Sequence, residues 1–169
     1  MTGPTTCAEC VKARTPIGEL TFSFAWSDLD VAASWNLARA WSIARARIDA
    51  GALPEIFDAD GLRTWIAEYS DVDPAHIDHL PDDVVDTIGL AADVDVRLYA
   101  PWLDIPADRA VNTVLLDGNH RAARALRDGR PFAAYFLSDV ELRSCLAHVA
   151  TGPAAAVVVP HAFADRGTA

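Results

Sequence analysis

The five residues from Asp117 to Arg121 have the side chains that a phosphate-binding turn requires. A glycine permits an unusual φ angle and lets a ligand approach the backbone closely, which is the expected role of Gly118. His120 and Arg121 can add charge-assisted hydrogen bonds, and the planar guanidinium of Arg121 matches two phosphate oxygens at once. Asn119 lies between Gly118 and His120 in the same turn. The pattern predicts an oxyanion site, although an acid followed by glycine is also an ordinary structural turn.

The elements on either side of this turn would form the site. The apolar run Ala110–Leu116 predicts a central strand, and 120–128 predicts a helix that Gly129 ends. The first amides of such a helix and the positive end of its dipole attract anions. Small side chains would let the helix pack closely against a sheet: Ala122, Ala123, Ala125 and Leu126. On this helix we expect Arg124 to add a phosphate contact and Arg127 to be solvated.

Three further elements are expected after the helix. Residues 132–137 form a strand in this prediction. Ser138 and Glu141 have the spacing of a capping box, which predicts a last helix with inward-facing Leu142, Leu146 and Val149. Cys145 is expected to fill the core, and residues 151–169 are expected to form a loose tail.

The first half of the chain predicts mainly helices. Residues 18–26 alternate like a half-buried strand, and a helix is expected over 27–50, stopped by Gly51 and Pro54. One face of this helix has Leu37, Trp41, Ala44 and Ile48, and three arginines are available for solvent or a partner: Arg39, Arg45 and Arg47. A second helix follows Asp58 or Asp60, with the apolar stripe Leu62, Trp65, Ile66 and Tyr69. Short helical pieces begin at Pro74 and Pro81, residues 93–99 form a strand, and 101–109 form a loop.

These expectations combine into a mixed α+β fold with one domain. Residues 1–17 would be a flexible leader and 18–150 the domain. Within it, 27–90 would be a helical N-terminal extension, and 91–150 would form the phosphate-binding core around a small sheet.

The charge distribution favours a small anionic ligand. The net charge is −10, which disfavours binding to a nucleic-acid backbone. Ten acidic residues and a single arginine lie between Asp71 and Asp108, whereas 109–130 has five arginines against two aspartates. A positive segment in an acidic protein suggests an anion site, but both segments are also typical of solvated faces.

Neither a membrane location nor a disulfide framework is expected. The uncharged run from Ser144 to Ala164 contains Pro153 and Pro160, which disfavour a membrane-spanning helix, and a cytoplasmic protein is predicted. Cys7 and Cys10 form a CxxC pair that is half of a zinc site, which His76 and His79 have the spacing to complete. Nothing in the sequence brings the two halves together, so no metal site is predicted.

The segment Leu115–Ala122 (LLDGNHRA) resembles the phosphate-binding signature of the ParB/sulfiredoxin superfamily. The resemblance covers about 71–143 and is most evident over 110–137. It is closest to the free-serine-kinase-like members, whose turn reads Asp-Gly-His-His-Arg. Sulfiredoxins have a catalytic cysteine where this chain has Asn119, so sulfinic-acid reduction by that mechanism is excluded. Chromosome-partition members continue into a helix-turn-helix domain, for which the roughly thirty residues after Leu137 are too few.

The resemblance implies that a nucleotide's phosphates bind at Gly118–Arg121, together with Mg²⁺. It also implies that Asp117 holds the metal or accepts a hydroxyl proton, although a simple helix-capping role is equally open. In the kinase-like members an upstream glutamate is the base, and neither Glu55 nor Glu68 can be matched to it.

The function predicted from this resemblance is an ATP-dependent phosphotransferase, or another nucleotide-hydrolysing enzyme, that acts on a small metabolite with Asp117 and His120 as catalytic residues. The alternative is a non-catalytic module that binds a nucleotide or a phosphorylated metabolite. A carboxylate that faces the turn within about 6 Å would favour catalysis, and apolar or basic surroundings would favour binding.

Overall fold

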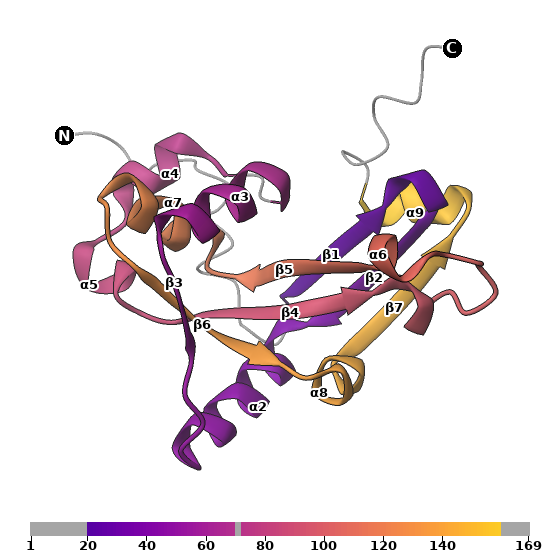
Figure 1. Cartoon of the computed structure of the whole chain (residues 1–169), viewed down its shortest axis with the longest axis horizontal. Helices are drawn as coiled ribbons and strands as arrows, with labels where there is room; N and C mark the ends of the chain where they lie inside the picture. The colour runs from indigo at the N-terminus through magenta and orange to yellow at the C-terminus, as the bar shows by residue number, and fades with distance from the viewer. Residues whose placement is uncertain (1–19, 70–71, 160–169) are drawn as a thin grey trace.

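The protein has a mixed α+β fold with two sheets (Figure 1). The computed structural model describes residues 20–69 and 72–159. The first sheet has the strand order β1-β2-β7 and is antiparallel. The second has the order β3-β6-β4-β5, in which β4 and β6 are parallel and the other pairs are antiparallel. The strands are β1 (Thr21–Trp26), β2 (Val31–Asn36), β3 (Glu55–Phe57), β4 (Gly89–Asp95), β5 (Val111–Asp117), β6 (Phe132–Leu137) and β7 (Leu146–Thr151).

Helices of different lengths connect these strands. The two short 3₁₀ helices are η2 (Ser27–Leu29) and η3 (Val96–Leu98). The α-helices are α2 (Leu37–Asp49), α3 (Ala59–Tyr69), α4 (Pro74–His79), α5 (Asp82–Val85), α6 (Ala107–Ala110), α7 (Asn119–Arg127), α8 (Asp139–Ser144) and α9 (Pro153–Val158). Within the described ranges, none of these helices has the length and apolar character that a membrane crossing requires.

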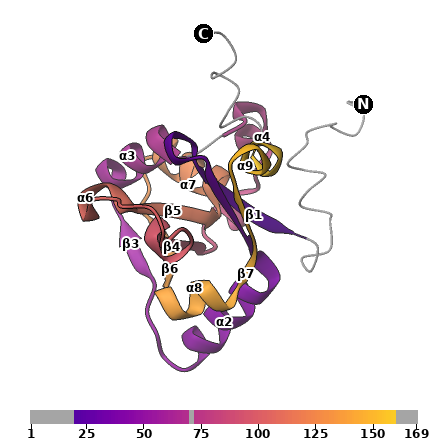
Figure 2. The ribbon, with the colours of Figure 1, turned by 90° about the vertical axis from the view of Figure 1, so that its right-hand side faces the viewer.

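The second sheet is covered on both faces. Along β4, Leu90, Ala92 and Val94 belong to a core shared with the first sheet, whereas Ala91 belongs to a core shared with α3 and α7. This alternation is the period of a strand, with successive side chains on opposite faces. Figure 2 shows α3 and α7 on one side of the sheet and α2 and α8 on the other. The turn between β5 and α7 therefore extends from a sheet that is packed on both faces.

The predicted helix over 27–50 was wrong in its first ten residues, which fold as η2 and β2. Asp30 adopts a left-handed conformation, with φ of 53°, and closes a hairpin between β1 and β2. All residues from Val31 to Trp35 are buried, so the strand shows no alternation of apolar and polar positions. The helix begins only at Leu37, after Asn36 accepts a hydrogen bond from the Arg39 amide.

The prediction after residue 138 was correct only for the start of α8. Its capping box forms and Cys145 is buried, both as predicted. The helix ends at Ser144, however, and Leu146 and Val149 lie in β7, paired with β2. The predicted loose tail begins with α9, whose Ala155 packs into a third small core. The edge of β2 provides hydrogen-bond partners that local sequence signals do not reveal.

Two strand predictions in the second sheet also needed correction. The strand predicted at 93–99 is β4, which ends at Asp95, because the Asp95 side chain accepts the Arg97 amide and starts η3. The strand predicted as central, 110–116, is the edge strand β5. Two indoles contact this strand: Trp26 donates to the Asn112 side chain at 3.0 Å, and Trp65 donates to the Thr113 carbonyl at 2.7 Å. The segment 27–90, predicted as a helical extension, also contains β2, β3 and the first residues of β4.

The sheet-packing prediction for α7 was confirmed. Ala122 and Ala125 are buried in the core that α7 shares with the second sheet, and Leu126 packs partly against the same core; Ala123 is also buried. The leader 1–17 and the Cys7–Cys10 pair lie outside the described residues.

Candidate functional site

The predicted turn joins β5 to α7 as the sequence indicates, but its glycine is buried in the fold. Gly118 has φ of 104°, which favours glycine, and no side chain caps α7 in the part of the chain described. A Cβ at this position would lie 3.1 Å from Phe132 Cζ and 3.2 Å from Gly89 Cα. The glycine thus allows β4, β5 and β6 to approach each other, and it does not line a ligand cavity.

Asn119 and His120 make contacts within the protein. The Asn119 amide group donates to the Leu115 carbonyl at 3.1 Å. Nε2 of His120 accepts the Asp73 backbone N–H at 3.1 Å, and its ring meets His76 edge-on with centroids 4.5 Å apart. Both side chains thereby hold the turn and the start of α4 in place.

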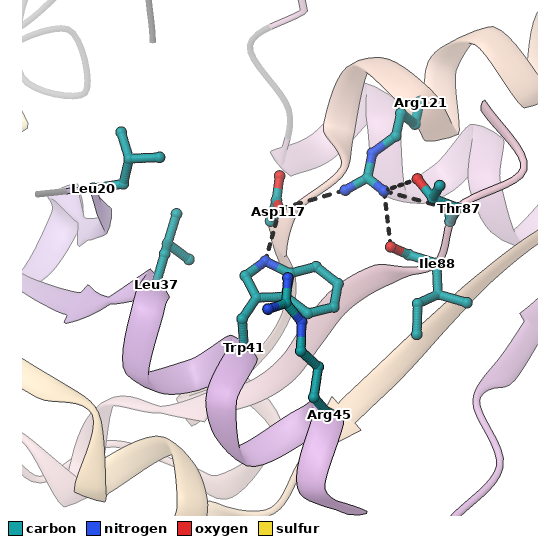
Figure 3. A pocket seen from close by; sticks show the side chains of 8 residues that line it. All are labelled: Leu20, Leu37, Trp41, Arg45, Thr87, Ile88, Asp117 and Arg121. Atoms are coloured by element: carbon teal, nitrogen blue, oxygen red, sulfur yellow. Dashed lines mark hydrogen bonds and ion pairs between the residues drawn. The ribbon is translucent and has the colours of Figure 1, made fainter. Parts of the chain in front are cut away.

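Arg121 lies between the protein backbone and a cavity. Its NH1 donates to the Ile88 carbonyl at 2.8 Å and to the Thr87 hydroxyl, and its NH2 lies 3.4 Å from Asp117 Oδ2. Only 14% of the Arg121 side chain is exposed, compared with 41% for Asp117. The guanidinium is therefore held in one orientation by the chain just before β4 (Figure 3).

A cavity of about 390 Å³ opens beside this Asp117–Arg121 pair. Its volume is within the range of small-molecule sites. The eight residues that line it come from the chain just before β1, from α2, from the chain before β4, from β5 and from α7: Leu20, Leu37, Trp41, Arg45, Thr87, Ile88, Asp117 and Arg121. Of the predicted site residues, the cavity brings together Asp117 and Arg121, whereas Gly118, Asn119, His120 and Arg124 do not line it.

Helix α2 contributes three cavity residues that the sequence prediction did not assign to a site, and two of them, Trp41 and Arg45, have polar groups. Trp41 Nε1 donates to Asp117 Oδ2 at 2.8 Å, which fixes the carboxylate. The Arg45 guanidinium lies over the Trp41 ring, 5.9 Å from its centroid, in a cation–π arrangement. Arg45 is exposed, and among the residues that the structure describes its guanidinium has neither an ion pair nor a hydrogen bond. The i, i+4 spacing of the two residues was the available signal, because it places them on one helix face.

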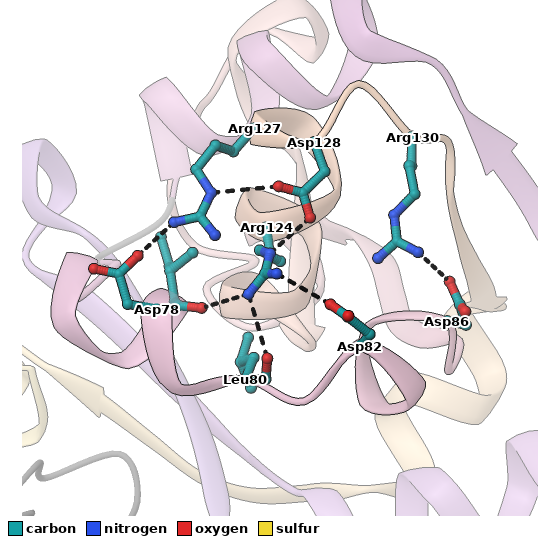
Figure 4. A network of polar contacts seen from close by, with 9 residues as sticks. Asp78, Leu80, Asp82, Asp86, Arg124, Arg127, Asp128 and Arg130 are labelled. Carbon is teal, nitrogen blue, oxygen red and sulfur yellow. Dashed lines mark hydrogen bonds and ion pairs between the residues drawn. The ribbon is translucent and has the colours of Figure 1, made fainter.

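The remaining arginines of the predicted anion-binding segment have partners in the protein (Figure 4). Arg124 donates to the carbonyls of Ile77 and Leu80 at 3.2 and 3.3 Å. It also pairs with Asp82 at 3.0 Å and with Asp128 at 2.6 Å. The hydrogen bond from Arg124 lowers the pKa of Asp128. Arg124 is thus already saturated by protein acceptors.

The two arginines that follow show the same behaviour. Arg127 pairs with Asp78, and Arg130 pairs with Asp86 at 3.0 Å. The acidic and basic segments seen in the sequence therefore neutralise each other across the α4–α5–α7 surface. The anion-site interpretation of this charge asymmetry does not apply to these arginines, and Arg127 is not simply solvated.

The surroundings of the turn supply few groups for metal binding or catalysis. Among the cavity-lining residues, only Asp117 is a carboxylate. Glu55 is exposed on β3 and does not line the cavity, and the Glu68 side chain is outside the description. The described residues contain no cluster of three or more histidine, cysteine or acidic side chains suited to a metal ion.

Comparisons with protein-family models, curated proteins and solved structures gave no match to the chain. The resemblance to the ParB/sulfiredoxin superfamily therefore stays a prediction that depends on the turn residues alone.

Proposed function

We propose that the cavity beside Asp117 and Arg121 binds a small phosphate-bearing molecule, and that the protein is a binding or regulatory module for it. The observation that carries the proposal is Arg45, a cation at the cavity without a polar partner in the described chain. A guanidinium can donate two parallel hydrogen bonds to a phosphate, which suits it to this role.

The charges of the cavity support an anionic ligand. Arg45 and Arg121 contribute two positive charges and Asp117 one negative charge, so the lining is positive by one. The surrounding protein has a net charge of −10, which makes this local positive charge distinctive. A concave site with low-dielectric walls strengthens the attraction of such a charge for an anion. A nucleotide and a phosphorylated metabolite are the two ligand classes that follow from the predicted turn.

Mg²⁺ fits this cavity poorly. Mg²⁺ in proteins is generally held by one or two carboxylates together with substrate phosphates. Here the single carboxylate already accepts the Trp41 N–H and lies 3.4 Å from the Arg121 guanidinium. Both contacts are made by Oδ2, so a divalent cation at Asp117 would be left with Oδ1 and would lie beside the positive charge of Arg121.

Calorimetric titration of the full chain tests the proposal. The panel comprises ATP, ADP, CTP, GTP, a simple phosphate monoester and inorganic phosphate, with and without Mg²⁺. At least one of them is expected to bind the wild type and to bind Arg45→Gln at least tenfold more weakly, since one charge-assisted pair accounts for about that much.

Arg39→Gln is the matched control. Arg39 is an exposed arginine on the same helix, and it does not line the cavity. Its substitution is expected to leave binding unchanged. Equal losses in the two variants would indicate a general effect of protein charge, and the proposal would then be wrong.

A phosphotransferase is the second candidate function, and the exposure of Asp117 favours it. With 41% of its side chain exposed at the cavity, Asp117 is accessible to a hydroxyl group of a substrate. Phosphoryl transfer depends mainly on positioning and charge neutralisation. Turnover of a radiolabelled nucleotide by the wild type, abolished in Asp117→Asn, would support it. Binding without turnover would contradict the phosphotransferase and would support only the binding function.

A further inference from the structure

We infer that the ligand of the cavity carries a single phosphoryl group on an apolar body, and that it binds without Mg²⁺. This inference rests on the proposed function, because it specifies the ligand class of the same cavity. It distinguishes a monophosphate ester from a nucleoside triphosphate.

The first argument is the charge of the lining. One positive charge in excess, from Arg45, offsets one negative charge, so a phosphate monoester of charge about −1.5 to −2 is left with at most about one uncompensated charge. A triphosphate brings about four negative charges, and uncompensated charges in a partly enclosed site are costly. A divalent cation would ordinarily offset them, but the one carboxylate available is bound to Trp41 and lies beside Arg121.

The second argument is the chemistry of the walls. Three aliphatic side chains line the cavity together with the Trp41 indole: Leu20, Leu37 and Ile88. Figure 3 shows Leu20 and Leu37 on one side of Asp117 and Ile88 on the other. A polyphosphate chain would place charged oxygens against these walls and lose hydration. An apolar body would instead remove both its own surface and these side chains from water, which is favourable.

The third argument is the position of Arg45. Its guanidinium rests on the indole, so the ring restricts where the cation can lie, and the same indole also fixes Asp117. The Arg45 guanidinium, which has no polar partner in the described chain, therefore lies against the apolar wall. This arrangement suits a ligand whose anionic group and apolar part are adjacent.

The experiment is a titration of the full chain with methyl, butyl and phenyl phosphate, and with ATP in the presence and absence of Mg²⁺. Affinity is expected to rise from methyl to butyl phosphate by about fourfold for each methylene group that becomes buried. ATP is expected to bind no more tightly than phenyl phosphate, and Mg²⁺ is expected not to strengthen it.

Ile88→Ala tests the wall directly, because Ile88 lines the cavity and belongs to none of the three core clusters. It is expected to reduce the ratio of butyl to methyl phosphate affinity severalfold. Ile56→Ala is the matched control: Ile56 is 74% exposed on β3, away from the cavity, and the ratio should be unchanged.

Two results would overturn the inference while leaving the proposed function intact. One is Arg45-dependent binding with equal affinity for methyl and butyl phosphate. The other is Mg²⁺-dependent ATP binding that is tenfold or more tighter than phenyl phosphate binding. If no probe binds in an Arg45-dependent way, the proposed function itself fails.

Discussion

Arg124 of α7 and Arg45 of α2 have the same side chain but different surroundings. Arg124 donates to two backbone carbonyls and two aspartates, and 16% of its side chain is exposed. Arg45 is exposed, and its one contact given by the structure is the face of Trp41. A guanidinium saturated by the protein stabilises the fold, whereas one without polar partners is available to a ligand. In this protein Arg124, Arg127 and Arg130 therefore form a structural junction, whereas Arg45 and Arg121 line the cavity.

The segment that Arg124 holds connects α7 with the cavity. Helix α4 has no buried residue, and the chain from Asp73 to Ile88 is attached to α7 by polar contacts as well as by Val85 and Leu80, which pack in the core of α3 and α7. Thr87 and Ile88, at its end, line the cavity. Arg124 and Arg127 thus contribute to the cavity indirectly, because they hold the chain that forms one of its walls.

The largest expected effect is that of Arg124→Met on stability. The change leaves the carbonyls of Ile77 and Leu80 without a charged donor, and its expected cost is about 2 kcal/mol of the free energy of unfolding. Arg45→Gln, without polar contacts to lose, should change it by less than about 0.5 kcal/mol. Urea unfolding measures both. Equal destabilisation by the two substitutions would contradict the comparison.

An intermediate effect is expected for Trp41→Phe. The substitution keeps an aromatic face for Arg45 but removes the N–H that donates to Asp117, which should cost about 1 kcal/mol of stability. Ligand affinity should fall less than in Arg45→Gln, because the guanidinium retains its support. Titration of both variants with phenyl phosphate ranks them, and a greater loss in Trp41→Phe would show that Asp117, and not Arg45, dominates binding.

The smallest effect concerns pH. Because Arg124 lowers the pKa of Asp128, the stabilisation by this pair is complete above the unfolded-state pKa and is lost as pH falls through the lower folded-state pKa. Below about pH 4 the wild type should therefore lose stability more steeply than Arg124→Met. Asp95, whose pKa is lowered by Arg97, titrates in both proteins and is the internal reference. Parallel pH profiles would show that the Arg124–Asp128 pair does not contribute.

Much of the fold around the turn could be predicted from the sequence. The strand–glycine–helix order of β5 and α7, the buried alanines of α7 and the capping box of α8 each depend on residues within one or two turns of each other. The hairpin of β1 with β2 and the pairing of β2 with β7 could not be predicted in the same way. Their hydrogen-bond partners are distant in sequence, and β2 is buried along nearly its whole length.

The residues of the candidate site likewise fall into two groups: those that local sequence predicts and those that only tertiary packing brings together. By itself the sequence determined that an acid, a glycine and an arginine would meet where a strand enters a helix, because local backbone geometry requires it. Only the tertiary structure decided which cations have partners: it paired Arg124, Arg127 and Arg130 with carboxylates, and it brought Trp41 and Arg45 of α2 beside Asp117. The physical reason is that a charge is available to a ligand only when no neighbouring group in the fold has already satisfied it, and such neighbours are set by packing between distant segments.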